Sequence, residues 1–241
     1  MSEARTTTAL VTGANKGLGR ETVRRLAELG WRVFLGARDP ERGGAAAAEF
    51  AAAGYQVSFV PLDVTSAESV ATAAKAVGEQ VSHLDVLINN AGIGGPWVAP
   101  ADTVAADVRE VFETNVFGPI QVTHAFLPLL RASARPRIVM VSSGMGSLAI
   151  TSDPARLEST LHGLGYPASK SALNMITTQY ARALPGIQVN AADPGYTATD
   201  LNGNSGTQTV TEGTDAIIRL ATLGTDGPTG GYFDRAGRLP W

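Results

Sequence analysis

The sequence contains no cysteine, so disulfide bonds and thiolate-bound metals are excluded. It has no apolar run long enough to cross a membrane, and nothing near Met1 resembles a signal peptide. Basic residues are not in excess, since 19 lysines and arginines stand against 22 aspartates and glutamates, a formal net charge of -3. Proteins that coat nucleic acid or anionic lipid are usually basic. We therefore expect a cytoplasmic protein with no nucleic-acid or membrane partner.

What is present is an alternation of short β-branched runs with longer amphipathic segments rich in alanine and leucine. It predicts strands at residues 7–12, 32–36, 56–62, 84–88, 136–141, 187–192 and 231–234. It predicts helices at 19–29, 41–53, 67–80, 104–131 (broken near Pro119), 166–184 and 211–223, with Ser66 as a cap. Residues 144–165 and 199–210 show no regular pattern. We expect a doubly wound parallel sheet of the Rossmann type with helices on both faces, in a single domain of residues 1–241.

A glycine-rich loop joins the first predicted strand to the first predicted helix, with the sequence Gly13-Ala14-Asn15-Lys16-Gly17-Leu18-Gly19. Glycines permit a tight turn and close backbone approach, and a helix N-terminus offers free N–H groups to a pyrophosphate. Three glycines alone are equally compatible with a plain strand-to-helix turn. Their position after the first strand of a βαβ unit favours a dinucleotide site.

The glycine spacing, Gly-x-x-x-Gly-x-Gly, differs from the usual dinucleotide fingerprint and resembles that of the short-chain dehydrogenase/reductase family. The Asn15-Lys16 pair is similar to the carbonyl-reductase branch of that family. The resemblance extends in motif order from Thr8 to Phe233. It implies a nicotinamide dinucleotide cofactor held by the loop residues Gly13, Asn15, Lys16, Gly17, Leu18 and Gly19.

The end of the second predicted strand bears on the choice between the two nicotinamide cofactors. An acidic residue there would accept hydrogen bonds from the ribose 2′-OH and repel a 2′-phosphate. The sequence instead has Arg38, and Asp39 follows it. Arg38 can pair with a phosphate through its planar guanidinium, and Lys16 could add a second positive charge. Both could also be ordinary surface cations, but together they favour NADP(H) over NAD(H).

Other strand ends supply the remaining cofactor residues that the resemblance implies. Asp63, followed by Val64, is either a turn cap or the family's contact to the adenine ring. Asn90 would support the sheet, and Ala91 and Gly92 would pack near the ribose. After the sixth strand the resemblance implies contacts to the nicotinamide amide and the pyrophosphate from Pro194, Gly195, Thr197 and Thr199. We assign no function to Asp193, which precedes this turn.

Tyr166 and Lys170 lie four positions apart, so they share one face of a helix. A free tyrosine has a pKa of about 10, too high for a good base at neutral pH. A nearby ammonium favours the phenolate, and we expect Lys170 to lower the pKa of Tyr166. This pattern occurs by chance in many helices and gains weight from its place after the fifth strand. Tyr166 and Lys170 are also expected beside the cofactor.

The resemblance implies a catalytic tetrad of Asn115, Ser143, Tyr166 and Lys170, hydride transfer and no metal. Ser143 ends the fifth strand, where a hydroxyl could polarise a substrate carbonyl, whereas Ser142 would serve packing or capping. Asn115 is a poor helix former in mid-helix. Its implied role is to hold a water that links Lys170 to solvent. We interpret the three histidines as structural or surface residues: His83, His124 and His162.

The segment 147–165 looks like an insertion before the catalytic helix, because Ser143 and Tyr166 are further apart than is usual in the family. Insertions there are linked to loss of the family's tetramer, so monomer, dimer and tetramer all stay open. We expect substrate contacts from variable stretches that contain Trp97, Met145, Leu164 and Tyr196. They predict a largely apolar pocket for a hydrophobic ketone or aldehyde.

The expected function is an NADP(H)-dependent carbonyl reductase or alcohol dehydrogenase that acts on a small molecule. Two alternatives remain. A sugar-nucleotide epimerase or dehydratase shares the tyrosine–lysine chemistry but usually has a longer C-terminal region than the 45 residues that follow Tyr196. A cofactor-binding sensor is the other, because a fold does not fix a function.

Overall fold

The computed structural model describes residues 6–241, and in this part of the chain seven strands form one sheet. Their order is β3-β2-β1-β4-β5-β6-β7, and every neighbouring pair is parallel. The strands are β1 (Thr8–Val11), β2 (Arg32–Ala37), β3 (Val57–Pro61), β4 (Val86–Asn89), β5 (Arg137–Val141), β6 (Gln188–Ala192) and β7 (Tyr232–Phe233). The winding direction reverses between β1 and β4, which opens a crevice at their carboxyl ends. The predicted doubly wound fold is confirmed.

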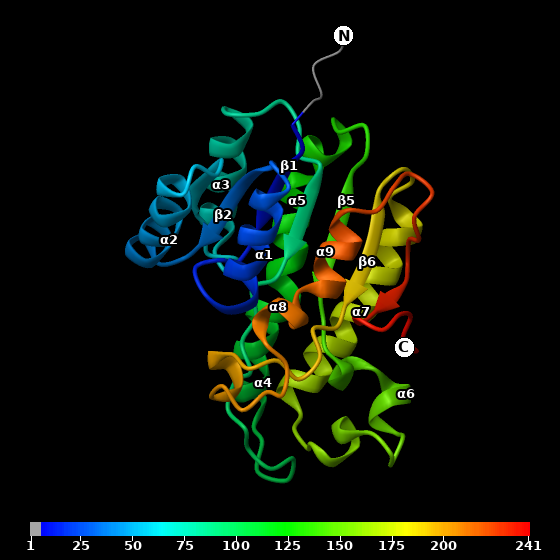
Figure 1. The fold of residues 1–241 in the computed structure, drawn as a ribbon. Helices are drawn as coiled ribbons and strands as arrows, with labels where there is room; N and C mark the ends of the chain where they lie inside the picture. Colours follow the sequence, from blue (N-terminus) through cyan, green and yellow to red (C-terminus); the bar gives the residue numbers. More distant parts are fainter. Residues whose placement is uncertain (1–5) are drawn as a thin grey trace.

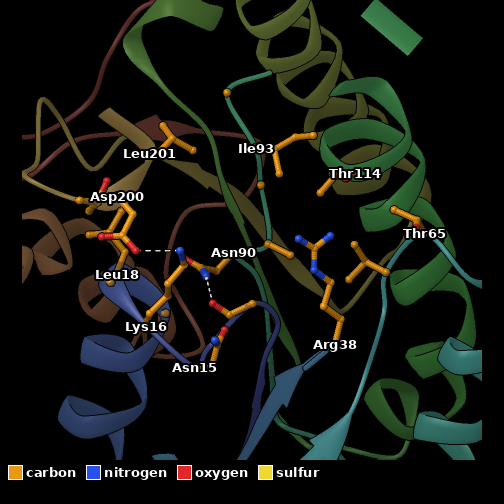
Figure 2. A pocket seen from close by; sticks show the side chains of 18 of the residues that line it. Asn15, Lys16, Leu18, Arg38, Thr65, Asn90, Ile93, Thr114, Asp200 and Leu201 are labelled. Atoms are coloured by element: carbon orange, nitrogen blue, oxygen red, sulfur yellow. Dashed lines mark hydrogen bonds and ion pairs between the residues drawn. The ribbon is translucent and has the colours of Figure 1, made fainter. Parts of the chain in front are cut away.

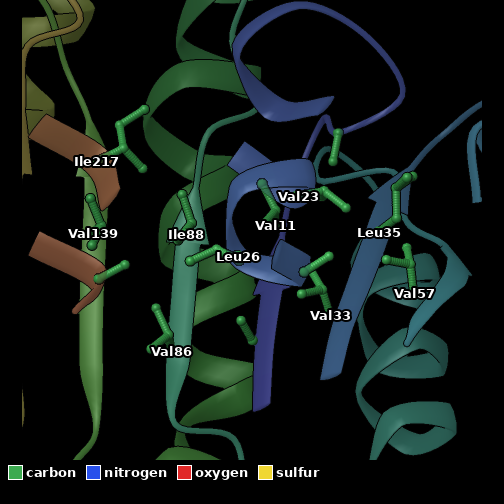
Figure 3. Packing of buried hydrophobic residues seen from close by; sticks show 14 of the residues in the cluster. Val11, Val23, Leu26, Val33, Leu35, Val57, Val86, Ile88, Val139 and Ile217 are labelled. Atoms are coloured by element: carbon green, nitrogen blue, oxygen red, sulfur yellow. The ribbon is translucent and has the colours of Figure 1, made fainter. Parts of the chain in front are cut away.

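Helices cover both faces of the sheet (Figure 1). One face carries α1 (Gly17–Glu28), α2 (Pro40–Ala52) and α9 (Asp215–Ala221), and the other carries α3 (Ala67–Gly78), α5 (Gly118–Arg131) and α7 (Gly165–Ala183). Strand side chains alternate between the two cores. Val11 packs with α1 in the cluster of Figure 3, whereas Leu10 belongs to the cluster on the opposite face. Both faces are therefore buried, as in other parallel sheets.

The helices that follow the first three strands begin in different ways. Asp39 caps α2 by accepting hydrogen bonds from the N–H groups of Glu41 and Arg42. Ser66 caps α3 by accepting from the N–H of Ser69, as predicted. Helix α1 has Lys16 at its N-cap, with no side-chain cap and no acidic residue in its first turn. The first N–H groups of α1 therefore donate no hydrogen bond to a capping side chain.

The long helix predicted over residues 104–131 is interrupted before Pro119. A π-helical turn, Glu113–Phe117, lies between α4 (Ala105–Phe112) and α5. Pro119 is the second residue of α5, directly after the π-helical turn, and the backbone at Phe117 and Gly118 remains helical. The irregularity thus precedes the proline and includes Asn115.

The two stretches without a predicted pattern contain short helical pieces. Residues 144–165 include the 3-10 turns Gly144–Gly146 and Leu157–Thr160 and the one-turn helix α6 (Leu148–Thr151). Residues 199–210 include the 3-10 turn Asp200–Asn202. The helix predicted at 211–223 is divided at Thr214 into α8 (Val210–Gly213) and α9. Within the described part of the chain, no helix combines the length and apolarity that a membrane span requires.

Candidate active site

Two adjoining cavities lie where the strands end. We call them the glycine-loop cavity, of about 470 Å³, and the tyrosine cavity, of about 500 Å³. Residues 13–19 and Arg38 line the first, whereas Ser143, Tyr166 and Lys170 line the second. Six residues line both cavities: Leu18, Asn90, Gly92, Trp97, Thr199 and Leu201. The two cavities therefore form one continuous site.

The glycine loop packs so closely on the end of β4 that side chains cannot be accommodated. A Cβ on Gly19 would lie 2.5 Å from the carbonyl oxygen of Gly13 and 2.5 Å from Nδ2 of Asn90. Gly13 has a positive φ of 62°, and its Cβ would lie 2.8 Å from the Cα of Ala91. The Nδ2 of Asn90 donates to the carbonyls of Thr12 (2.9 Å) and Gly13 (3.1 Å). Asn90 thus joins β4 to the start of the loop.

This geometry fits a dinucleotide. The uncapped N–H groups at the start of α1 face the glycine-loop cavity, and such groups bind phosphate through hydrogen bonds and the helix dipole. Every residue expected to hold the cofactor lines one of the two cavities: Gly13, Asn15, Lys16, Gly17, Leu18, Gly19, Arg38, Asp63, Val64, Asn90, Ala91, Gly92, Tyr166, Lys170, Pro194, Gly195, Thr197 and Thr199. Sequence reasoning did not assign Thr65 or Thr114, which also line the glycine-loop cavity.

Arg38 and Lys16 lie on opposite sides of the glycine-loop cavity (Figure 2). Lys16 Nζ donates to Oδ2 of Asp200 at 2.7 Å, so it does not reinforce the charge of Arg38. Arg38 forms no ion pair within residues 6–241 and extends into the cavity. Asp39 is turned toward α2, where it caps the helix and pairs with Arg42 at 3.3 Å. A guanidinium rather than a carboxylate therefore faces the cavity.

Asp63 shows both features that the sequence left open. Its Oδ1 accepts hydrogen bonds from the N–H (2.9 Å) and the hydroxyl (2.8 Å) of Thr65, which makes it a turn cap. It also lines the glycine-loop cavity, as does Val64. Capping and lining are compatible, because only one carboxylate oxygen takes part in the cap.

Tyr166 and Lys170 project from the first turns of α7 into the tyrosine cavity. Lys170 is 5% exposed, and its Nζ donates to the carbonyl of Val141 at 2.8 Å. The same Nζ lies 5.6 Å from the centre of the Tyr166 ring. The ring of Trp97 packs on the other side of the site, 6.2 Å from the Tyr166 ring. The tyrosine is thus held between a buried ammonium and an indole.

The pKa of Tyr166 departs from the expectation. Burial raises it to about 12, although a hydrogen bond with Ser143 acts in the opposite direction. Burial also lowers the pKa of Lys170 to about 8, although the negative charge of Asp193 acts in the opposite direction. The predicted lowering of the tyrosine pKa by Lys170 is wrong for this chain, because burial dominates.

The two serines after β5 have different surroundings. Ser142 is 1% exposed, and its hydroxyl donates to Oδ1 of Asn174 at 2.6 Å. Ser143 is more exposed and lines the tyrosine cavity beside Tyr166. Its Oγ accepts a hydrogen bond from the N–H of Met145 at 3.3 Å, so the hydroxyl proton remains available to another acceptor. Ser143 is therefore the serine whose proton can reach a substrate.

Asn115 lies in the π-helical turn and is fully buried outside both cavities. Its side chain accepts from the N–H of Ile93 (2.9 Å) and donates to the carbonyl of Ile93 (2.9 Å) and to Ser169 Oγ (3.0 Å). A Cβ on Gly92 would lie 3.4 Å from Oδ1 of Asn115 and 3.6 Å from Nζ of Lys170. Oδ1 of Asn115 and Nζ of Lys170 thus lie on the same side of Gly92. π-helical turns are frequent at functional sites.

The substrate side of the tyrosine cavity agrees only in part with the expected contacts. Trp97, Met145 and Tyr196 line it, but Leu164 lies outside both cavities at the N-cap of α7 and is 46% exposed. Its side chain does not reach the site, because the chain turns into the helix there.

Sequence reasoning missed an acidic residue in this cavity. Asp193 is only 6% exposed, and its Oδ1 accepts from the N–H of Gly195 at 2.9 Å. Burial raises its pKa to about 6, and the charge of Glu158 adds to this effect. A carboxylate at the end of a buried apolar strand was the available signal, because such residues are rarely buried without a role.

A doubly wound sheet with a glycine loop at its switch point defines a dinucleotide-binding α/β protein. The chain belongs to the short-chain dehydrogenase family, whose sequence profile matches residues 7–209. It is accordingly an oxidoreductase of the class that acts on alcohol and carbonyl groups.

Two curated relatives and one solved structure illustrate the similarity. A short-chain dehydrogenase, anuI, of Penicillium roqueforti is 39% identical over 90% of this chain and 88% of its own. The (+)-neomenthol dehydrogenase of Arabidopsis thaliana is 33% identical over 98% of each chain. The NADPH-bound carbonyl reductase from chicken fatty liver has a TM-score of 0.88 and 31% identity, over 98% of this chain and all of the other.

Proposed function

We propose that the chain is an NADP(H)-dependent carbonyl reductase or alcohol dehydrogenase with Tyr166 as its general acid and base. The observation that carries the proposal is that Ser143, Tyr166 and Lys170 line a cavity continuous with the glycine-loop cavity. The similarity to an NADPH-bound carbonyl reductase supports it.

Cofactor choice follows from the adenosine side of the site. The loop residues 13–19 and the start of α1 would hold the pyrophosphate, and Arg38 would bind a 2′-phosphate. Asp39 does not oppose this, because its carboxylate caps α2. When bound, nicotinamide supplies or accepts the hydride.

The protein side of the reaction is proton transfer at the substrate oxygen. With a pKa of about 12, Tyr166 is protonated at neutral pH, so in reduction it donates its proton as the carbonyl becomes an alcohol. Ser143 donates a hydrogen bond to the same oxygen and stabilises its developing negative charge. The ammonium of Lys170 stabilises the phenolate that remains. Asn115 positions the Ile93 backbone and, through a water, would reconnect Lys170 to solvent.

We further propose that residues 147–165 are an insertion that shapes substrate choice. Leu157, Glu158 and Leu161 of this segment line the tyrosine cavity. Together with Trp97 and Met145 they give a mainly apolar wall, which suits a ketone or aldehyde with a hydrophobic body.

The experiment is to follow oxidation of NADPH and of NADH against ketones, aldehydes, quinones and dicarbonyls. The wild type should prefer NADPH and reduce at least one class. Tight NADPH binding without turnover of any carbonyl would contradict the proposal and indicate a cofactor-binding sensor.

A further inference from the structure

The deep end of the tyrosine cavity differs from its apolar wall. Asp193, which follows β6, and Glu158, from the turn Leu157–Thr160, both line it together with Tyr166. A Cβ on Gly144 would lie 2.6 Å from Oε1 of Glu158 and 3.2 Å from Oδ2 of Asp193. The two carboxylates therefore flank the same point beside the catalytic serine. A larger residue at position 144 would require the Glu158 carboxylate to move.

The positively charged side chains near Glu158 and Asp193 do not neutralise both carboxylates. Arg156 Nε lies 3.6 Å from Oε2 of Glu158, the oxygen other than the one near Gly144, and the Arg156 side chain is 44% exposed. Lys170 donates to the carbonyl of Val141, and its charge interacts with that of Asp193 without a direct ion pair. Asp193 receives backbone N–H hydrogen bonds but forms no ion pair within the described residues. Mutual repulsion and burial both disfavour its charge, as its raised pKa shows.

A second observation is independent of the carboxylates. Tyr232 of β7 is fully buried, and its hydroxyl has no hydrogen-bond partner in the described structure. Tyr232 is the register partner of Ala191, and Asp193 follows Ala191 by two residues, so Tyr232 and Asp193 share one face of the sheet. Burial and the charges of Asp193 and Glu158 raise the pKa of Tyr232. Tyr232 does not itself line the cavity, but its unpartnered buried hydroxyl, which costs free energy, lies within reach of the charges of both carboxylates.

We propose that Glu158 and Asp193 bind a protonated amine of the substrate, so that the preferred substrates are apolar ketones or aldehydes that carry a basic nitrogen. This inference rests on the proposed function and names its substrate class. An ammonium brings up to three N–H donors and one positive charge. The cavity offers carboxylate oxygens from two elements. The apolar wall formed by Met145, Leu157 and Leu161 would contact the rest of the molecule.

The test uses two ketones of the same shape. One is N-methylpiperidone with the nitrogen opposite the carbonyl, and the other is methylcyclohexanone with the methyl group at the same position. Binding to the NADPH complex is measured by calorimetry at neutral pH, and kcat/KM is measured separately. The wild type should favour the amine by about tenfold in both measurements, a difference of about 1.4 kcal/mol. Glu158→Gln and Asp193→Asn should each reduce this ratio several-fold.

Asp153→Asn serves as the matched control, because Asp153 is an exposed carboxylate of the same segment outside the cavity. It should leave the amine preference unchanged. Equal binding of both ketones by the wild type, or an unchanged ratio in Glu158→Gln, would overturn the inference while carbonyl reduction stands. If neither ketone is reduced and no other carbonyl is, the proposed function fails, and the calorimetric ratio still decides whether the acidic end binds an amine.

Discussion

The two cavities of the site are built in different ways. One wall of the glycine-loop cavity is a run of nearly consecutive residues, 13 and 15–19, where backbone groups and missing side chains define the shape. The tyrosine cavity is lined by side chains from β5, α7, the end of β6 and residues 157–161, which are far apart in the sequence. A cavity made of backbone fits one kind of ligand, the phosphates of a dinucleotide. When a cavity is lined by side chains, a substitution of one of them can change which substrate the cavity prefers.

The largest expected effect separates chemistry from cofactor binding. Tyr166→Phe removes the proton donor but leaves the glycine-loop cavity intact, so kcat should fall by about a thousandfold with NADPH affinity unchanged. Single-turnover rates and fluorescence titration of NADPH measure the two quantities. Tyr180→Phe, on the same helix but outside both cavities, should keep the wild-type rate. A rate in Tyr166→Phe close to that of wild type would exclude Tyr166 as the acid.

The second prediction concerns stability at the tyrosine cavity. The pKa of Asp193 is about 6 in the folded chain, whereas the ordinary value of an aspartate carboxyl is 3.8. The carboxyl therefore stabilises the fold below about pH 4, and this contribution is lost as the pH rises through about 6. The difference amounts to about 3 kcal/mol.

Asp193→Asn has no charge to bury, so its free energy of unfolding should exceed that of wild type increasingly between about pH 4 and 7. Urea unfolding across this range measures the difference. Glu79→Gln, on the surface just after α3, supplies the control and should show no such trend. A constant difference between Asp193→Asn and wild type at every pH would mean that the Asp193 charge is not destabilising.

A third prediction tests the backbone-built cavity. Gly19→Ala places a methyl group against Gly13 and Asn90, and overpacking of this kind costs about 1–3 kcal/mol. NADPH affinity should fall with stability, because the loop must move. Gly44→Ala in α2 meets no atom within 4 Å and should instead stabilise the chain by about 0.5–1 kcal/mol. If Gly19→Ala and Gly44→Ala change the unfolding temperature in the same direction and by the same amount, close packing of the glycine loop does not contribute to stability.

The smallest expected effect concerns cofactor choice. Arg38→Asp replaces the guanidinium that faces the cavity by a carboxylate, so the ratio of kcat/KM for NADPH to that for NADH should fall by about tenfold or more. Arg135→Asp, in the loop before β5, is the control for an added negative charge. An unchanged ratio in Arg38→Asp would assign the 2′-phosphate to other residues.

The sequence predicted the doubly wound parallel sheet and the glycine loop, because periodicity and glycine spacing are local properties. It also predicted Ser66 as a cap. It predicted a break near Pro119, where the structure has a π-helical turn ending at Phe117, but it did not predict the π-helical form, which has no composition of its own. It also missed Asp193 and the direction of the Tyr166 pKa shift, since both depend on burial by segments distant in the chain.

The wide turn Glu113–Phe117 has a consequence for insertions and deletions in this part of the gene. A π-helical turn contains one residue more than a regular helical turn, so loss of a single codon here could yield one continuous helix from α4 to α5. Each helical residue advances the chain by about 100°. Because the π-helical turn already holds the surplus residue, its loss would leave α4 and α5 facing nearly as they do now, whereas the loss of a residue from regular α5 would rotate one part of the helix against the other by that angle. We therefore expect a one-residue deletion in this turn to be tolerated better than one in regular α5, provided that Asn115 keeps its contacts to Ile93 and Ser169.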